Sequence, residues 1–218
     1  MTVVAFANQK GGTGKTTLLM NVAAALHHCG RRVAILDADP QGTASRWSQA
    51  NRQQPFPVPI HPAGRSAEEV TKAIKSARRG VDLLLVDCPP SVEGEETRAA
   101  VSVSDWVVIP VAPSPPDLWA TRGIVHLMAA LPNKGSRRHG LLVANRVPPR
   151  SALGRDVLEL LAEFEFPLAR TAIGARAAYA QAAALGCSVL DLKRADAACA
   201  EIQALTEELL SHIDGARP

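Results

Sequence analysis

The chain has 218 residues and a formal net charge of +3, from 24 Lys and Arg against 21 Asp and Glu. Hydrophobic residues make up 47% and charged residues 21%, which is typical of a soluble globular protein and excludes collagen, coiled coils and low-complexity chains. The longest apolar runs, such as Trp106–Val111, are far shorter than the roughly 20 residues that cross a bilayer, and the first residues do not resemble a secretion signal. We therefore expect one domain over residues 1–218, located in the cytoplasm.

Five short runs rich in Val, Ile, Leu and Ala predict buried strands. They are apolar on both faces, and the segments between them are long enough to hold crossover helices, as in parallel sheets covered on both sides. The sequence therefore predicts an α/β fold with a doubly wound, mostly parallel sheet. The expected strands are Val3–Ala7, Val33–Leu36, Leu83–Val86, Val107–Val111 and Leu141–Ala144.

Apolar residues at helical spacing predict helices between and after these strands. The proline-rich stretch Gln53–Gly64 is expected to be an irregular connection within the domain. The expected helices are Lys15–His28, Ala67–Ala77, Leu118–Leu131 and Arg155–Phe164, with a closing pair around Ala175–Leu185 and Ala195–Ile213.

The small net charge conceals an uneven distribution along the chain. Residues 134–194 carry +5, whereas the final 24 residues carry −4. A basic segment of this kind is either an electrostatic surface for phosphate backbones or simply a solvated surface, and the sequence leaves both open.

The motif KGGTGKTT, residues Lys10–Thr17, follows the first predicted strand and leads into the first predicted helix. This context indicates a phosphate-binding loop, because glycines let backbone N–H groups converge on phosphate oxygens at a helix N-terminus. Lys15 would reach the β- and γ-phosphates, and the Thr16 hydroxyl would bind Mg²⁺. The predicted nucleotide-binding residues here are Gly11, Gly12, Thr13, Gly14, Lys15, Thr16 and Thr17.

A second lysine, Lys10, at the start of the loop makes the motif resemble the deviant Walker A sequence of the ParA/MinD family of P-loop NTPases. The resemblance continues in order through Ile35–Gly42, Leu83–Pro90 and Val108–Pro115, and it is strongest to short ParF-like partition proteins. It implies that ATP and Mg²⁺ are bound, that an ATP-bound homodimer forms, and that Lys10 reaches the nucleotide of the partner subunit. Hydrolysis of ATP to ADP and phosphate is then expected to be slow and stimulated by a partner.

Three carboxylates at predicted strand ends are candidates for the chemistry. Asp39 would orient or deprotonate the attacking water, a role that the family resemblance also implies. Asp87 would hold Mg²⁺ through water, and Asp37 would support the Mg²⁺ shell from further away. Turn or helix-capping roles remain open for Asp37 and Asp39.

Three further positions lie near this expected site. Asp117 is expected to cap the following helix, with a contact near the nucleotide and dimer interface as the alternative. Asn145 and Arg146 match the place from which the family draws adenine contacts, although a simple turn is also possible. A side chain at Gly12 would collide with a closing partner subunit, so Gly12→Val should block dimer closure or hydrolysis.

The family resemblance implies that the ATP-bound dimer coats nucleoid DNA without sequence preference, and that a cargo-bound ParB-like or adaptor protein stimulates hydrolysis. Plasmid or chromosome partition is the leading interpretation, and positioning of a protein organelle such as a carboxysome or a chemotaxis cluster is the alternative. The acidic C-terminal stretch Glu201–Ile213 argues against a MinD-like membrane helix, and a biosynthetic P-loop ligase would not require Lys10. The DNA-binding candidates are Arg150, Arg155, Arg170, Arg176, Lys193 and Arg194.

Overall fold

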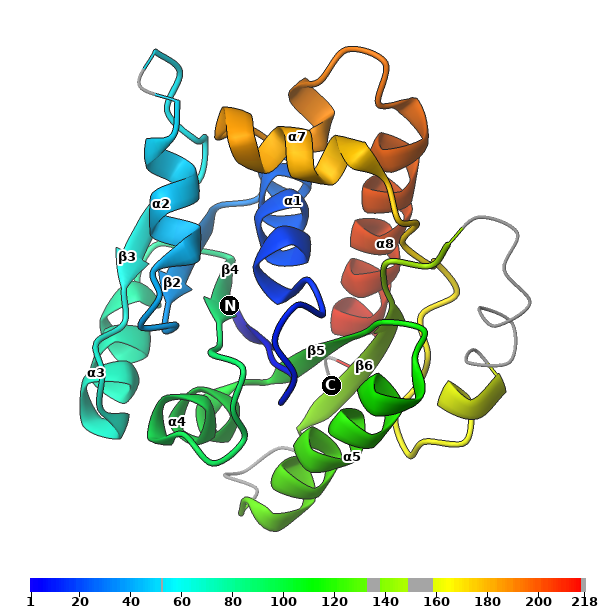
Figure 1. Cartoon of the computed structure of the whole chain (residues 1–218). Coiled ribbons are helices and arrows are strands. Elements are labelled where there is room, and N and C mark those ends of the chain that lie inside the picture. The colour runs from blue at the N-terminus through cyan, green and yellow to red at the C-terminus, as the bar shows by residue number, and fades with distance from the viewer. Residues whose placement is uncertain (52, 133–137, 149–158, 217–218) are drawn as a thin grey trace.

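The computed structural model describes residues 1–51, 53–132, 138–148 and 159–216. Within these ranges six parallel strands form one sheet in the order β3-β2-β4-β1-β5-β6. This is the doubly wound α/β fold that the apolar runs predict (Figure 1). The strands are β1 (Thr2–Phe6), β2 (Val33–Asp37), β3 (Ile60–Pro62), β4 (Leu83–Asp87), β5 (Trp106–Val111) and β6 (His139–Ala144).

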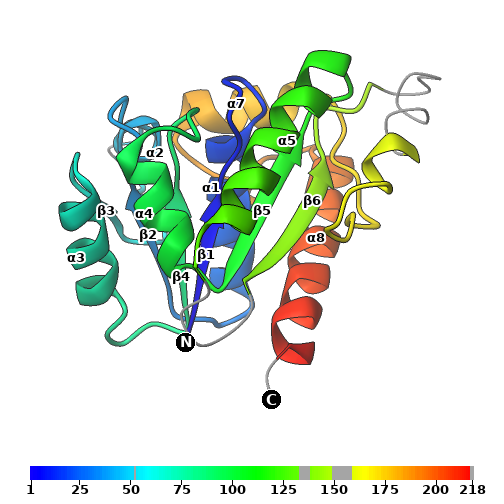
Figure 2. The ribbon, with the colours of Figure 1, turned by 90° about the horizontal axis from the view of Figure 1, so that it is seen from below.

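Helices cover both faces of the sheet, as parallel strands that are apolar on both sides require. Figure 2 shows α4 and α5 in front of the sheet and α1 behind it. One buried cluster joins the sheet to α1 (Lys15–His28), α2 (Thr43–Gln49), α7 (Ala177–Leu185), the short 3₁₀ helix η1 (Val189–Asp191) and α8 (Asp196–Gly215). The other cluster joins it to α3 (Ala67–Ala77), α4 (Glu95–Val103) and α5 (Pro115–Ala130).

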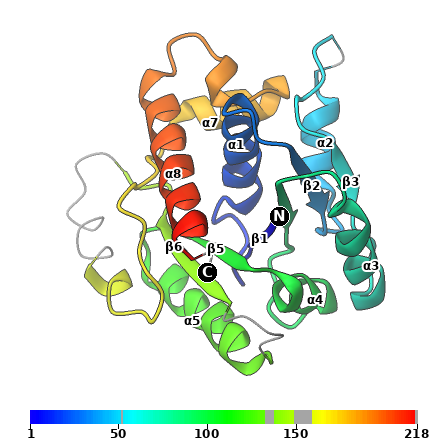
Figure 3. The same ribbon diagram turned by 180° about the vertical axis from the view of Figure 1, so that it is seen from behind.

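The C-terminal helix packs against the domain with its apolar stripe. Ile202, Leu205, Leu209 and Ile213 are each at most 2% exposed, and α8 lies beside α1 (Figure 3). The stripe in this acidic helix is therefore explained by packing within the domain, against α1 and its buried cluster. No helix in the described part of the chain is long and apolar enough to cross a membrane.

The structure corrects several predicted elements. The stretch 53–64 contains the edge strand β3, whose three residues and terminal proline give a weak strand signal. Helices α2 and α4 were not predicted, because α2 buries only Ala44 and Trp47, and α4 is short and rich in small and polar residues. Residues 155–158 of the predicted helix Arg155–Phe164 lie outside the described residues; of the rest, 159–161 are helical, whereas 162–164 form a turn and a bend, so the helix ends before Phe164.

Helix α5 begins three residues earlier than predicted. Its N-cap is Ser114, whose Oγ accepts the N–H of Asp117, and prolines follow at the first two helical positions. Asp117 is thus the third residue of the helix, and the expectation that it is the cap is wrong. Prolines are favourable at this point because their missing N–H groups have no partner in the first turn.

The strand order places a binding crevice at the carboxyl end of β1. The chain moves from β1 to β2 on one side of the sheet and later from β4 to β5 on the other, so the direction of winding reverses beside β1. In open α/β sheets, ligands bind at such a reversal, beyond the carboxyl ends of the strands. The loop Lys10–Gly14 and the strand-end residues Asp37 and Asp87 meet at this edge.

Candidate nucleotide-binding site

The loop between β1 and α1 has the backbone conformation of a phosphate-binding loop. Gly12 and Gly14 have φ of 78° and 88°, in the left-handed region that glycine adopts without strain. Gly14 is also the N-cap of α1 and provides no side-chain cap, and the first turn of the helix contains no acidic residue. The N–H groups of this turn are therefore available to an anion.

The two lysines of the loop occupy different environments. Lys15 is 6% exposed and lines a cavity of about 550 Å³, where its Nζ donates to the carbonyl of Lys10 at 3.1 Å. Burial lowers the pKa of Lys15, opposed by the nearby charge of Asp87. By contrast, Lys10 is not among the residues that line this cavity, and its Nζ lies 2.6 Å from Oδ2 of Asp117 on α5. Asp117 thus contacts the phosphate loop. A contact near the nucleotide site was the alternative that the sequence left open beside a capping role.

Asp87 and Asp37 lie side by side at the carboxyl ends of β4 and β2. Oδ2 of Asp87 accepts the Thr16 hydroxyl at 2.7 Å, and burial raises the pKa of Asp87 to about 7. Oδ2 of Asp37 accepts both the N–H and the hydroxyl of Ser45 in the first turn of α2, at 2.9 and 2.7 Å. Within the described residues, Oδ1 of each aspartate is buried without a hydrogen-bond partner.

These residues fit a nucleotide-bound Mg²⁺ ion. The two partnerless carboxylate oxygens and the Thr16 hydroxyl form an oxygen-rich corner beside the loop, and Mg²⁺ prefers oxygen ligands. In the described part of the chain, no group of three or more His, Cys, Asp or Glu could hold a metal ion by itself. Phosphate oxygens and water would have to supply the remaining ligands.

Asp39 lines the cavity after the end of β2. Its Oδ1 accepts the N–H of Gln41 at 2.9 Å and its carbonyl accepts the N–H of Gly42 at 2.8 Å, so it also forms a turn before α2. The turn that the sequence left open as the alternative to a catalytic role is therefore present, and it holds the carboxylate at the cavity.

The backbone of the phosphate loop is held by two residues that directly follow β6, Asn145 and Arg146. Nδ2 of Asn145 donates to the Thr13 carbonyl at 2.7 Å, and Nη1 of Arg146 donates to the Gly12 carbonyl at 2.6 Å. A Cβ atom at Gly14 would overlap the Asn145 amide. Both residues also line the cavity, but their hydrogen bonds go to the loop backbone. The sequence predicted their proximity to the nucleotide and missed this bracing role.

The C-terminal segment forms the opposite wall of the cavity. Arg176 and Tyr179 line it, and both are held by Glu201 of α8. Arg176 Nη2 lies 2.5 Å from Oε1 of Glu201, the Tyr179 hydroxyl donates to Oε2 at 3.1 Å, and the Gly174 N–H donates to Oε2 at 3.2 Å. Burial, followed by the charge of Glu201, raises the pKa of Tyr179. No local sequence pattern links residues this far apart, and Glu201 and Tyr179 were not predicted as site residues.

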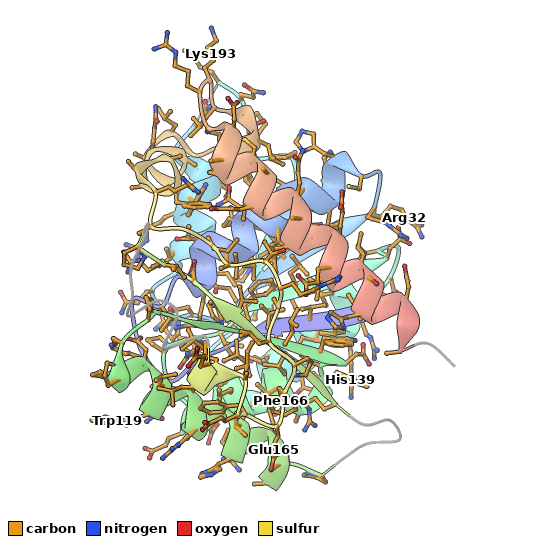
Figure 4. All side chains as sticks on the ribbon, turned by 90° about the vertical axis from the view of Figure 1, so that its right-hand side faces the viewer. Arg32, Trp119, His139, Glu165, Phe166 and Lys193 are labelled. Carbon is orange, nitrogen blue, oxygen red and sulfur yellow. The ribbon has the colours of Figure 1, made fainter. Side chains whose placement is uncertain are left out.

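The predicted DNA-binding residues do not form one group. Arg150 and Arg155 lie outside the described residues. Arg176 lies in the cavity wall with its guanidinium paired, and the exposed side chain of Arg170 lies 3.7 Å from Glu208. Lys193 and Arg194 are exposed in the loop before α8, and Lys193 projects from one end of the molecule (Figure 4).

A parallel doubly wound sheet with a glycine-lysine loop between β1 and α1 defines a P-loop NTPase fold. Residues 4–205 match the model of the CobQ/CobB/MinD/ParA nucleotide binding domain. The chain belongs to this family, as its motifs predicted.

Three curated relatives span nearly the whole chain. The chain is 33% identical over 209 residues to the maintenance of carboxysome distribution protein A of Halothiobacillus neapolitanus, covering 95% of both proteins. It is 36% identical over 211 residues to the protein of the same name from Gloeobacter kilaueensis, covering 95% of this chain and 93% of that one. It is 29% identical over 246 aligned residues to the chromosome-partitioning ATPase Soj of Thermus thermophilus, covering 98% and 97%.

Solved structures agree with the fold. An ATP complex of a McdA variant from Cyanothece superposes with a TM-score of 0.75 at 16% identity, covering 96% of each chain. MinD from Pyrococcus horikoshii, complexed with Mg-ADP, superposes with a TM-score of 0.72 at 22% identity, covering 97% of this chain and 98% of that one. At these identities the likeness establishes the architecture.

Proposed function

We propose that the chain is an ATP-dependent dimerising ATPase that distributes a protein organelle of the carboxysome kind over the nucleoid. The motifs alone put plasmid or chromosome partition first and organelle positioning second. The two carboxysome-distribution relatives, at 33% and 36% identity, reverse that order. Partition remains the second candidate, supported by the 29% identity to Soj.

The cavity has the groups that phosphoryl transfer to water requires, namely charge neutralisation and an oriented nucleophile. Lys15 and the N–H groups of the loop would bind the β- and γ-phosphates, and Asp39, which lines the same cavity, would orient the attacking water. Thr16 would hold Mg²⁺, with Asp87 and Asp37 supporting its water ligands. When bound, the ion would neutralise part of the negative charge of the phosphates.

The position of Lys10 is the observation that carries a dimeric mechanism. Its ammonium lies outside the cavity of its own chain and is held by Asp117 at 2.6 Å, although it belongs to the phosphate loop. In that position it can serve the nucleotide of a second copy more readily than its own. ATP would then favour the dimer, and hydrolysis would release it, as a nucleotide switch requires.

The cationic surface supports retention of the ATP form on DNA. Lys193 and Arg194 are exposed outside the cavity, and a two-fold dimer would present each of them twice. Contacts to the phosphate backbone are independent of sequence and weaken steeply with salt. Cargo specificity would then come from an adaptor protein that also stimulates a slow basal hydrolysis.

The proposal is tested first on the purified protein. Light scattering should give a monomer with ADP and a dimer with ATP, and non-specific duplex DNA together with a cargo-bound adaptor protein should accelerate hydrolysis. A protein that stays monomeric with ATP would contradict the dimeric mechanism.

The cargo is tested in the host. Deletion of the gene should cluster fluorescently labelled organelle shells while plasmid retention stays unchanged, and the wild-type gene, but not Lys15→Ala, should restore spacing. Plasmid loss with normal organelle spacing would instead establish the partition function.

A further inference from the structure

We infer that Ser45, in the first turn of α2, is a positioning residue for the Mg²⁺ ion of the nucleotide site. It would act by fixing the carboxylate of Asp37, so that one oxygen is occupied and the other is left for a water ligand of the ion. The inference rests on the nucleotide-dependent ATPase proposed above. It assigns a role in that site to a residue that lies outside the sequence motifs.

Ser45 places both of its hydrogen-bond donors on the same oxygen of Asp37. Its N–H and its hydroxyl donate to Oδ2 at 2.9 and 2.7 Å, and Asp37 is only 5% exposed. The N–H bond alone would serve to cap α2, whose N-cap Gly42 provides no side-chain cap. The half-buried hydroxyl donates to the carboxylate instead of to a backbone carbonyl of its own helix. It therefore adds a second constraint on the orientation of Asp37.

The other oxygen of Asp37 is suited to a cation and its water ligands. Within the described residues, Oδ1 is buried without a hydrogen-bond partner, and Asp37 makes no ion pair. A buried carboxylate oxygen without a partner is costly, so its retention calls for a compensating ligand. Asp37 is not among the residues that line the cavity, so it would reach the ion through water.

The neighbouring aspartate is held in the same way. Asp87 is the register partner of Asp37 in the pairing of β4 with β2. Its Oδ2 accepts the Thr16 hydroxyl at 2.7 Å, and its Oδ1 is likewise buried without a partner among the described residues. Thr16 lies in the first turn of α1, as Ser45 lies in the first turn of α2. A hydroxyl thus orients each carboxylate, as the groups behind a metal's ligands commonly do.

Mn²⁺ binding tests this role without turnover. Mn²⁺ takes the same oxygen ligands as Mg²⁺ and is detected by electron paramagnetic resonance, and ADP as the nucleotide removes both hydrolysis and the ATP-dependent dimer. In the ADP complex, Ser45→Ala should weaken Mn²⁺ binding about tenfold, since the loss of a group that orients a metal-supporting residue commonly has an effect of this size. ADP affinity in EDTA, measured by calorimetry, should stay within about twofold of the wild type.

A graded series of variants separates the hydroxyl from the fold of α2. Ser45→Thr keeps the donor and should bind Mn²⁺ as the wild type does, whereas Ser45→Cys, with a weaker donor, should be intermediate. Ser48→Ala is the matched control, because it removes a hydroxyl from the same helix that donates to the Ser45 carbonyl at 2.9 Å. It should change thermal stability alone and leave Mn²⁺ affinity at the wild-type value.

The possible outcomes separate the role of Ser45 from the proposed function. A wild-type protein that binds no nucleotide, or whose ADP complex binds no Mn²⁺, contradicts the proposed function and this inference with it. Wild-type Mn²⁺ affinity in Ser45→Ala overturns the role of Ser45 and leaves the proposed function standing. Equal losses of ADP affinity with Mn²⁺ and in EDTA would mean that Ser45 only holds α2 in place, which also overturns the inference.

Discussion

The phosphate loop and the C-terminal segment 168–215 form opposite walls of one cavity, but they are built differently. The loop residues are neighbours in sequence, and β1 and α1 fix their positions. The C-terminal wall depends on Glu201, which binds Gly174, Arg176 and Tyr179 across 22 to 27 residues of chain.

The charge asymmetry of the sequence has a structural counterpart in the C-terminal wall. The basic segment and the acidic C-terminal helix contact each other in space, with Arg176 paired to Glu201 and Arg170 near Glu208. Part of the +5 therefore stabilises the domain internally. A charge count along the sequence thus overestimates the cationic surface available to DNA.

The largest effect is expected at Asp39, on the catalytic side of the loop. Asp39→Ala should lower the hydrolysis rate about 100-fold or more, because positioned acid-base groups contribute about 10²–10⁴. ATP should still bind, and the dimer should accumulate in light scattering. Normal phosphate release by this variant would contradict the assigned role.

The two lysines of the loop provide a matched pair. Lys15→Ala should weaken ATP binding to the monomer at least about 100-fold, since charge-assisted bonds to two phosphates are lost. Lys10→Ala should leave that affinity within about threefold, because Lys10 does not line the cavity. Calorimetry measures both, and an equal loss for the two variants would place Lys10 in its own nucleotide site.

Removal of the exposed cations before α8 should affect DNA retention. Lys193→Gln with Arg194→Gln should weaken binding of the ATP form to non-specific DNA about tenfold at moderate salt and reduce the dependence of affinity on salt. Arg78→Gln with Arg79→Gln, an exposed pair after α3, makes the same charge change elsewhere. Equal losses for the two pairs would mean that DNA responds only to net charge.

The C-terminal wall should show a smaller effect on the nucleotide. Glu201→Gln should weaken ATP binding about fivefold, because Arg176 and Tyr179 lose their common partner. Glu207→Gln, on the exposed side of the same helix, should have no effect. If Glu201→Gln binds ATP as tightly as the wild type, this wall does not contribute to affinity.

The smallest effect concerns a surface pair outside both regions. Hydrogen bonds from Arg32 lower the pKa of Asp82 to about 2, below its ordinary value of 3.8. Because the folded state lowers this pKa, the pair stabilises the fold above about pH 4, and the contribution disappears as the pH falls towards 2. Arg32→Met should lower Tm at pH 7 by about 2 °C at most and return the pKa of Asp82 towards 3.8 in an NMR titration. An unchanged pKa would show that Arg32 is not its cause.

Sequence reasoning was most accurate where structure depends on neighbouring residues. Helix α1 begins and ends at the predicted residues, and the five predicted strands are all present, because their apolar runs are strong local signals. It missed α2, α4 and β3, which have weak patterns and acquire their structure by packing. It also misassigned Asp117 as the N-cap of α5. Ser114 and Asp117 are both polar and only three residues apart, and the structure shows that Ser114 is the cap.

The sequence by itself determined the family, the parallel fold and the phosphate loop, because each depends on a short motif or an apolar run whose physics is local. Only the tertiary structure decided the environment of each charge. It placed Lys15 inside the cavity and Lys10 outside it, turned Asn145 and Arg146 towards the loop backbone, and paired Arg176 with Glu201. Hydrogen bonds and ion pairs act over a few ångströms in space, and distances along the chain do not reveal which groups will meet.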